Sequence, residues 1–310
     1  MTIGIAAYGQ NAGRAVLDGL RATEVLGRGA IGGFAVFSIL DRQGVHRQIA
    51  CQRGGASQLQ AADAFGDARC AAVISSGPDR PEPLSQFLVA GAGLGLVTGH
   101  RLPNRIDAAG VPSNASVLRR MARGETPSEA VQAAVGGDPE MDAGLIAVTL
   151  DGRIGFANTA RVARRCDLIQ ASRADERRGY ALLGNSIHFA VGCGGGTAIG
   201  DVVWSRLSGG PARTFLAELA HPVPVCRART DRVEIDAAGR VTLIRRADPW
   251  WPEPAGLTTV IYSRAPVWQD GRPVGVCASE VFARLAGDLA TPSPEIQSRF
   301  AVERDPHVTP

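Results

Sequence analysis

The fold of this 310-residue chain is decided by the stretch Leu145-Ile-Ala-Val-Thr-Leu-Asp151-Gly152-Arg-Ile-Gly-Phe-Ala-Asn158-Thr159. An apolar strand leads into an Asp-Gly turn, and a second strand follows. The Asp-Gly pair supplies the positive φ that a tight turn demands, so the stretch predicts a β-hairpin. The pattern recurs at residues 34–51, with Asp41-Arg-Gln-Gly44, and at 233–244, with Asp236-Ala-Ala-Gly239. Helix-like stretches precede the first two copies, and together these features indicate a layered α/β (α+β) architecture with antiparallel hairpins.

Periodicity places further elements around the hairpins. The sequence predicts strands at 2–7, 71–74, 94–97, 180–183 and 258–262, and helices at 11–26, from 112 through Met121, at 126–135, 197–207 and 212–219. Asn11 is expected to cap the first helix, and Thr126-Pro-Ser-Glu129 reads as a capping box with proline at the first helical position. We expect a single domain over residues 1–292, with C-terminal elaboration from about residue 200, and a loose tail over 293–310.

Composition excludes several kinds of chemistry. The chain contains no lysine, so all 33 positive charges are arginine. Schiff-base catalysis, a phosphate-loop lysine and a Ser–Lys dyad are therefore unavailable, whereas arginine can clamp a carboxylate through two parallel N–H bonds. The net charge of +3 is spread along the chain and aromatic residues make up only 5%. A nucleic acid is therefore not expected as a partner.

Cysteine usage and the first residues of the chain indicate the cellular compartment of the protein. Six cysteines, at positions 51, 70, 166, 193, 226 and 277, show no C-x-x-C spacing, and no histidines pair at metal spacing. We therefore expect no metal and no cofactor. Met1 to Tyr8 lacks the basic flank of a signal peptide, and no apolar run approaches the ~20 residues of a membrane helix. The sequence predicts a cytoplasmic, bacterial-type protein with free thiols and no membrane partner, and it leaves a homo-oligomer open.

Clustered polar residues follow four of the apolar strands. Strand ends are where layered α/β proteins place ligands. The candidates for substrate binding are Ser75, Ser76, Arg80, Arg101, Asn104, Thr159, Asn185 and Ser186. Arg80 or Arg101 would bind a substrate carboxylate, and Asn158 or Asn185 would stabilise an oxyanion. The simpler interpretation is that Ser, Asn and Asp close turns after strands.

His100 is the best-placed histidine, because it lies between Gly99 and Arg101 with Pro103 nearby. The neighbouring arginine should depress the pKa of the imidazole and keep it neutral, which suits a general base. A plain surface histidine is the alternative.

The stretch from Ser116 to Thr159, two helices followed by the second hairpin, resembles the helix–helix–hairpin of N-terminal-nucleophile hydrolases. It is most similar to a small uncharacterised bacterial group of that superfamily, and more loosely to the isoaspartyl peptidase and asparaginase branch. The resemblance implies a four-layer αββα sandwich and an amide bond as the usual substrate. Where the asparaginase branch carries a threonine before the hairpin, this chain has Asp142-Ala143-Gly144.

The same resemblance implies a nucleophile at a free amino terminus, with its own α-amine as the base. Thr2 meets this need once Met1 is removed, and a small second residue permits that removal. The ordinary α-amine pKa near 8 lies close enough to neutrality for the amine to accept a proton. The alternative is that Thr2 is an ordinary β-branched strand residue.

Three hypotheses follow. The first is an amidohydrolase acting on a C–N bond of a small, carboxylated amide, lactam or cyclic imide, with Thr2, His100 and Asn158 as catalytic residues. The second is a non-catalytic subunit that binds a small ligand or a partner. The third is a cysteine-dependent epimerase or hydrolase that uses Cys51 and Cys193. The nucleophile is thus open between Thr2, Cys51, Ser75, Ser76 and Cys193.

Overall fold

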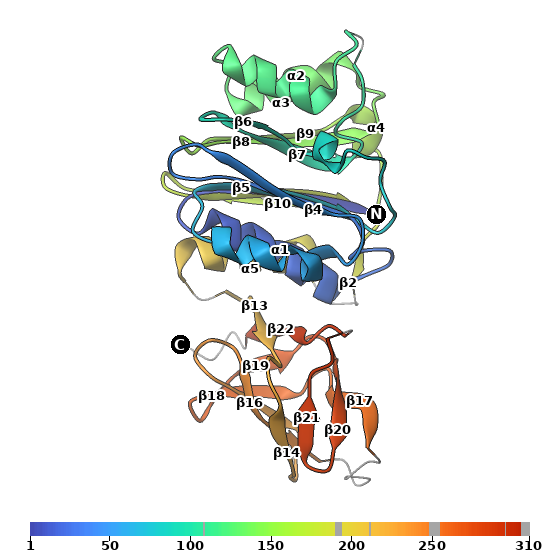
Figure 1. The fold of residues 1–310 in the computed structure, drawn as a ribbon, viewed down its shortest axis with the longest axis vertical. Helices are drawn as coiled ribbons and strands as arrows, with labels where there is room; N and C mark the ends of the chain where they lie inside the picture. The colour runs from blue at the N-terminus through green and yellow to red at the C-terminus, as the bar shows by residue number, and fades with distance from the viewer. Residues whose placement is uncertain (108, 190–193, 211, 248–254, 295, 305–310) are drawn as a thin grey trace. The chain divides into compact units, whose positions relative to one another are not determined.

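The hairpin at residues 143–158 forms as its sequence predicts, and so do the other two. In the computed structural model, Gly152, Gly44 and Gly239 take positive φ values of 92°, 77° and 79° at the three turns. The structure describes residues 1–107, 109–189, 194–210, 212–247, 255–294 and 296–304. The chain divides into two compact units, Met1–Gly210 and Pro211–Pro310, and the hairpins belong to both (Figure 1).

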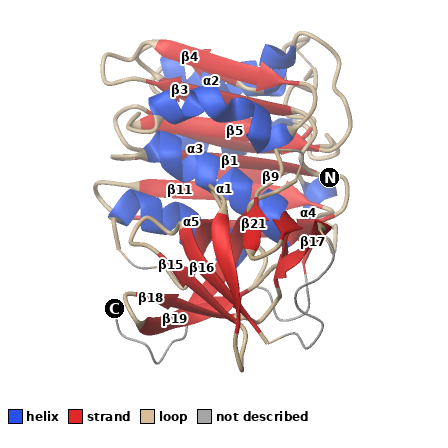
Figure 2. Ribbon diagram, turned by 60° about the horizontal axis from the view of Figure 1, so that its bottom comes forward, coloured by secondary structure: helices blue, strands red, loops and turns tan. Residues whose placement is uncertain are grey.

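The first unit contains two antiparallel sheets. The larger sheet has the order β10 (Leu168–Ala174), β11 (Gly179–Asn185), β1 (Thr2–Tyr8), β5 (Cys70–Ser76), β3 (Ala35–Leu40) and β4 (His46–Cys51). The smaller sheet has the order β6 (Val89–Gly91), β7 (Gly95–Arg101), β8 (Ala143–Thr149) and β9 (Ile154–Asn158). Strand β1 therefore lies in the interior of the larger sheet, and Figure 2 shows it between β5 and β11.

Helices cover the outer face of each sheet. The larger sheet carries α1 (Ala12–Leu26) and α5 (Gly196–Ser208), and the smaller sheet carries α2 (Ser113–Ala122) and α3 (Pro127–Gly137). Figure 1 shows the four layers in the order helices, sheet, sheet, helices. The αββα sandwich is confirmed, and so is the capping box of Thr126 and Glu129 at the start of α3. None of the helices in the described ranges has both the length and the apolar character needed to cross a membrane.

Short elements connect the layers of the first unit. They are β2 (Gly27–Arg28) paired with β12 (His188–Phe189), the 3₁₀ segments η1 (Gly55–Phe65) and η2 (Leu84–Phe87), and α4 (Ala160–Ala163). Asn11 precedes α1 in a left-handed conformation and its side chain makes no cap, contrary to our expectation. Instead, backbone carbonyls accept from the first amides of the helix: Gly13 N donates to Ala68 O and Arg14 N to Gly66 O.

The core between the two sheets shows which residues of β1 face the smaller sheet. Ala6 and Tyr8 pack with Ile74, Leu96 and Ile146 between the sheets. Successive strand residues alternate between faces, so Thr2 and Gly4 face the second sheet as well. A Cβ atom at Gly4 would overlap the backbone carbonyl of Gly99 on β7. Glycine at this position therefore lets β1 and β7 approach closely beside Thr2.

The second unit contains a ten-stranded sheet around its own apolar core. Its order is β13 (Thr214–Glu218), β22 (Arg299–Arg304), β19 (Arg272–Cys277), β18 (Pro266–Gln269), β15 (Arg232–Ile235), β16 (Val241–Arg246), β14 (Val223–Arg227), β21 (Leu289–Thr291), β20 (Val281–Ala286) and β17 (Gly256–Ile261). Val225, Val233, Ile244 and Phe300 are buried in this core.

Two expectations for the second unit differ from the structure. The predicted helix at 212–219 is the strand β13, because residues 214–218 find a partner along their whole length in β22. Residues 299–304, which lie in the expected loose tail, form that partner strand. Phe300 of β22 is fully buried, and this burial of an aromatic side chain holds the segment in the sheet.

Candidate functional site

A row of polar side chains crosses the larger sheet where β1 begins. Thr2 lies opposite Asn185 of β11 on one side and opposite Ser76 of β5 on the other. Directly opposed side chains share one face of a sheet, with Cβ atoms about 5 Å apart. All three residues are buried, and Thr2 is only 2% exposed. A threonine, a serine and an asparagine are thus held together against the second sheet.

Arg80 reaches this row from the loop after β5. Its Nε donates to Ser76 Oγ at 3.2 Å, and its Nη2 donates to Thr2 Oγ1 at 3.2 Å. Within the described part of the chain, no carboxylate forms an ion pair with this guanidinium. Burial lowers the pKa of Arg80, and the positive charge of Arg101 lowers it further. A half-buried arginine with hydroxyl neighbours and no anionic partner is suited to bind a carboxylate.

The side chain of His100 contacts residues of both sheets beside this row of polar side chains. It lies within β7, which runs on to Arg101, and its side chain is fully buried rather than placed on the surface. Its Nδ1 is 3.2 Å from Asn185 Oδ1, and its Nε2 is 2.7 Å from Asn158 Oδ1. Burial is the main cause that lowers the pKa of His100, although the hydrogen bonds to Asn158 and Asn185 oppose it. The imidazole is therefore neutral near pH 7, and both of its nitrogens are occupied.

Two ion pairs flank the cluster. Arg101 pairs with Asp142, with Nε 2.9 Å from Oδ1 and Nη2 2.5 Å from Oδ2. Arg165 pairs in the same bidentate way with Asp167, at 2.8 and 2.6 Å. Arg101 is thus already engaged by a carboxylate, whereas Arg80 is not. The sequence does not single out Asp142, Arg165 or Asp167 as site residues; the Arg165-x-Asp167 spacing before a strand is the available signal.

The electrostatic field of these arginines reaches the α-amine of Met1. Burial lowers the pKa of this amine most, and Arg101, Arg80 and Arg165 lower it further, while Asp167 opposes them. A positive environment disfavours the protonated amine. An amine at this end of β1 is therefore more readily neutral than one in a free peptide.

Other predicted site residues lie outside this cluster. Ser75 faces the opposite side of β5 and its Oγ donates to Phe34 O. Thr159 caps α4 and donates to Met141 O, and Asn104 donates to Gln86 Oε1. Ser186, by contrast, contacts both Asn185 and Asp167.

The structure disfavours Cys51 as a nucleophile. The Cys51 thiol donates to Gly55 O, and burial raises its pKa, which disfavours the thiolate. Cys193 lies outside the described residues. Throughout the described ranges, no group of three or more His, Cys, Asp or Glu side chains is arranged to hold a metal ion.

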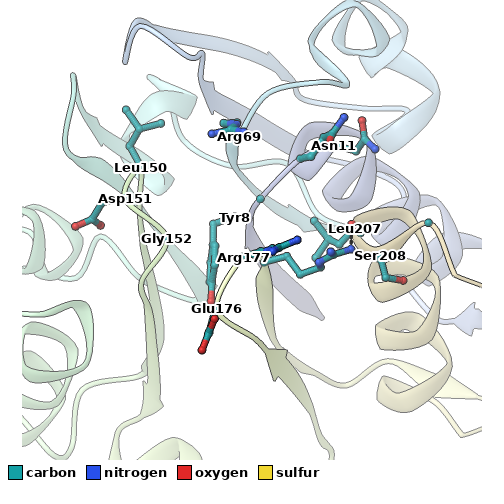
Figure 3. Close-up of a pocket in the computed structure, with 14 residues that line it drawn as sticks. Tyr8, Asn11, Arg69, Leu150, Asp151, Gly152, Glu176, Arg177, Leu207 and Ser208 are labelled. Carbon is teal, nitrogen blue, oxygen red and sulfur yellow. Dashed lines mark hydrogen bonds between the residues drawn. The ribbon is translucent and has the colours of Figure 1, made fainter.

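A separate cavity of about 610 Å³ lies at the other end of β1 (Figure 3). Its lining includes Tyr8, Arg69, Asp151, Glu176 and Arg177, which come from several loops. Among the residues that the structure describes, the lining contains no histidine and no cysteine. The neighbouring amides at the start of α1 already donate to backbone carbonyls, so they are not available to an anion. The groups suited to amide chemistry gather at the Thr2 end instead.

The fold and the cluster define an αββα protein with a buried Thr–Arg–Asn–His arrangement at one rim. Residues 2–215 match the family "Domain of unknown function (DUF6963)", and the chain belongs to that family. Residues 222–294 match "Domain of unknown function (DUF7259)". A search of curated proteins found no match.

Among solved structures, the chain is similar to glutamine phosphoribosylpyrophosphate amidotransferase from B. subtilis in complex with ADP and GMP, with 9% sequence identity and a TM-score of 0.32. The alignment covers 58% of this chain and 41% of the amidotransferase. This chain thus spans less than half the length of that protein.

Proposed function

We propose that the first unit is an amidohydrolase of the N-terminal-nucleophile type, which acts on a C–N bond of a small, carboxylated amide, lactam or cyclic imide. One observation carries the proposal. Thr2 stands at the start of an interior strand, its Oγ1 accepts a hydrogen bond from an arginine that has no carboxylate partner in the described chain, and an asparagine lies directly opposite. Nucleophile, anion-binding group and oxyanion donor are thus adjacent.

Removal of Met1 would make the α-amine of Thr2 the catalytic base. The same burial and the same arginines that lower the pKa of the Met1 amine would act on it. In the first step, the Thr2 oxygen bonds to the carbonyl carbon and the α-amine takes the hydroxyl proton. The C–N bond then breaks, the leaving nitrogen takes that proton, and an acyl ester remains. Water hydrolyses the ester, releasing the acid and restoring Thr2.

The substrate carboxylate would bind Arg80. Asn185 would stabilise the oxyanion, because Ser186 accepts from only one of its two amide hydrogens and it lies opposite Thr2. Asn158 also has an amide group at the cluster, on the far side of His100. Arg101, which is held by Asp142, contributes positive field rather than a free binding group.

The test combines intact-mass spectrometry with activity screening on small cyclic and linear amides. We expect a mass lacking Met1, hydrolysis of at least one carboxylated amide, and a loss of ~10³-fold or more in kcat for Thr2→Ala, as removal of a nucleophile demands. Thr98→Val is the matched control, because it removes another buried hydroxyl, one that donates to Val73 O on the neighbouring strand β5. A retained Met1 together with full activity of Thr2→Ala would exclude this mechanism.

The non-catalytic alternative has one observation in its favour. The Met1 side chain packs against Gly29, where a Cβ atom would overlap Met1 Sδ and Cε. A chain that keeps this residue has no free amine on Thr2. Its Arg80 would then bind a small carboxylate without turnover, which binding calorimetry on the Met1-containing protein distinguishes from hydrolysis.

A further inference from the structure

The hydrogen bonds around His100 form one continuous chain that begins at an ion pair. Arg165 holds Asp167, Asp167 accepts from Ser186 Oγ at 2.6 Å, and Ser186 Oγ accepts from Asn185 Nδ2 at 2.9 Å. Asn185 then contacts His100, and His100 contacts Asn158. The chain therefore crosses from the larger sheet to the smaller one.

The direction of the first bonds is fixed by the chemistry of their atoms. The pKa of Asp167 is lowered to about 2, chiefly by its hydrogen bonds to Arg165 and Ser186. Asp167 is thus an ionised carboxylate that only accepts. The single hydroxyl hydrogen of Ser186 must lie on the 2.6 Å line to Asp167, since two oxygens at that distance need a hydrogen between them.

The Ser186 oxygen is then left with its two lone pairs. One accepts from Arg165 Nη2 at 3.2 Å and the other accepts from the amide of Asn185. The amide group of Asn185 must therefore present its nitrogen to Ser186, which turns Oδ1 toward His100. A carbonyl oxygen only accepts, so Nδ1 of His100 must carry a hydrogen.

We infer that Asp167 and Ser186 are positioning residues that hold buried His100 in its Nδ1–H tautomer. In a neutral imidazole, Nε2 is then an acceptor, and Asn158 must turn its amide nitrogen toward it across the 2.7 Å contact. His100 is thus a bridge between two asparagines of opposite sheets, with no nitrogen free to act as a general base. In this proposal His100 has a positioning role in place of the catalytic role that the sequence predicts.

The consequence for catalysis rests on the proposed function: the chain would fix Asn185 opposite Thr2 with one amide hydrogen committed to Ser186 and the other available to an oxyanion. The direction of the hydrogen bonds does not depend on any activity. It is set by Asp167 even in a chain that hydrolyses no amide.

Long-range ¹H–¹⁵N NMR of the imidazole nitrogens tests the inference directly. In an untagged full-length chain with His46, His188, His221 and His307 replaced by glutamine, His100 is the sole histidine. We expect its Nδ1 to show the signal of a protonated nitrogen and its Nε2 that of an unprotonated one at neutral pH. An Nε2–H tautomer or an imidazolium in this protein overturns the inference, whatever the variants do.

Two variants then test the positioning role. Ser186→Ala removes the acceptor for the Asn185 amide, and Asp167→Asn removes the obligate acceptor for Ser186. We expect the ratio of Nδ1–H to Nε2–H tautomer to fall at least threefold in either variant. Glu140→Gln is the control, because it breaks an exposed bidentate pair with Arg164 elsewhere in the same unit. A smaller change in every correctly folded variant shows that Asp167 and Ser186 do not set the tautomer.

Discussion

At the scale of single residues, the site depends on which side of a strand each group faces. The sequence identified Thr2, Arg80, His100, Asn158 and Asn185, which the structure brings together. It also proposed Ser75 and Ser76 jointly, although neighbouring residues of a strand point to opposite faces. Only the register with β1, which pairs Ser76 with Thr2, decides between them. Residues such as Asp167 were missed because an acid beside a strand end has the pattern of an ordinary turn.

Gly144 leaves the space that the bridge between His100 and Asn158 occupies. A Cβ atom there would overlap the amide end of Asn158 and His100 Nε2, which contact each other across 2.7 Å. We expect Gly144→Ala to lower the free energy of unfolding by about 1–3 kcal/mol, as overpacking of a buried site does. Urea denaturation measures the change. Gly136→Ala, in the open space of α3, should instead be neutral or stabilise by up to about 1 kcal/mol; equal effects would contradict this account.

The charge of Arg80 should appear in the pH profile of the proposed hydrolysis. Burial and nearby arginines lower the pKa of the Met1 amine, and the Thr2 amine exposed by Met1 removal would meet the same charges, so its neutral, basic form would predominate from a lower pH upward. Arg80→Gln removes one of these charges, and the amine pKa should rise. The ascending limb of kcat/KM against pH should then move to higher pH by about half a pH unit, because solvent partly screens the charge of Arg80.

The pH profile of Arg153→Gln provides the comparison, because Arg153 forms an exposed pair with Asp151. Its ascending limb should coincide with that of the parent protein. An ascending limb of Arg80→Gln that also coincides with the parent would show that Arg80 does not act on the catalytic amine.

At the scale of elements, the sequence predicts correctly the structures whose signal lies within a few residues. It does not predict strand pairing between segments that are far apart in the chain. The three hairpins and the capping box each carry their signal within a few residues. The segment 214–218 forms a strand only because it pairs with 299–303, which lies far along the chain. The same limit hides how the site residues are arranged: they come from β1, β7, β9, β11 and the end of β5, and only the packed sheets bring these strands together.

The packing of α1 on α5 depends on one buried carboxylate. Asp18 of α1 accepts from Arg21 at 3.1 Å and from Arg206 of α5 at 2.5 Å, and it is 5% exposed. Asp18→Asn removes the charge that both arginines contact, so we expect a loss of about 2–3 kcal/mol in unfolding free energy. Hydrogen exchange should be faster in both helices.

Asp151→Asn is the control for this pair of helices. It breaks an exposed pair with Arg153 and should cost less than about 1 kcal/mol. If Asp18→Asn costs no more than this control, the two helices are held by their apolar contacts alone.

At the scale of the whole molecule, the chain consists of two units that each have a core of their own. The buried apolar residues described in the first unit lie within that unit and include Ile199 and Val203 of α5, and the apolar cluster of the second unit comes from residues 217–302. We therefore expect residues 1–210, produced alone, to unfold cooperatively and to keep the tautomer of His100 found in the full chain. Denaturation and NMR of this fragment check the expectation; an aggregated or non-cooperative fragment would contradict it.

Strand β1 is paired on both sides from Thr2 to Tyr8. Its first residue is therefore held in the sheet by a neighbouring strand on each side, and a segment attached ahead of it begins near Arg80, Arg101 and Arg165, whose charges act on the Met1 amine. An amino-terminal affinity tag would leave Thr2 without the free α-amine that the proposed mechanism needs. Expression vectors for assays of this protein should therefore carry their tags at the other end of the chain, or a protease site that leaves no extra residue before Thr2.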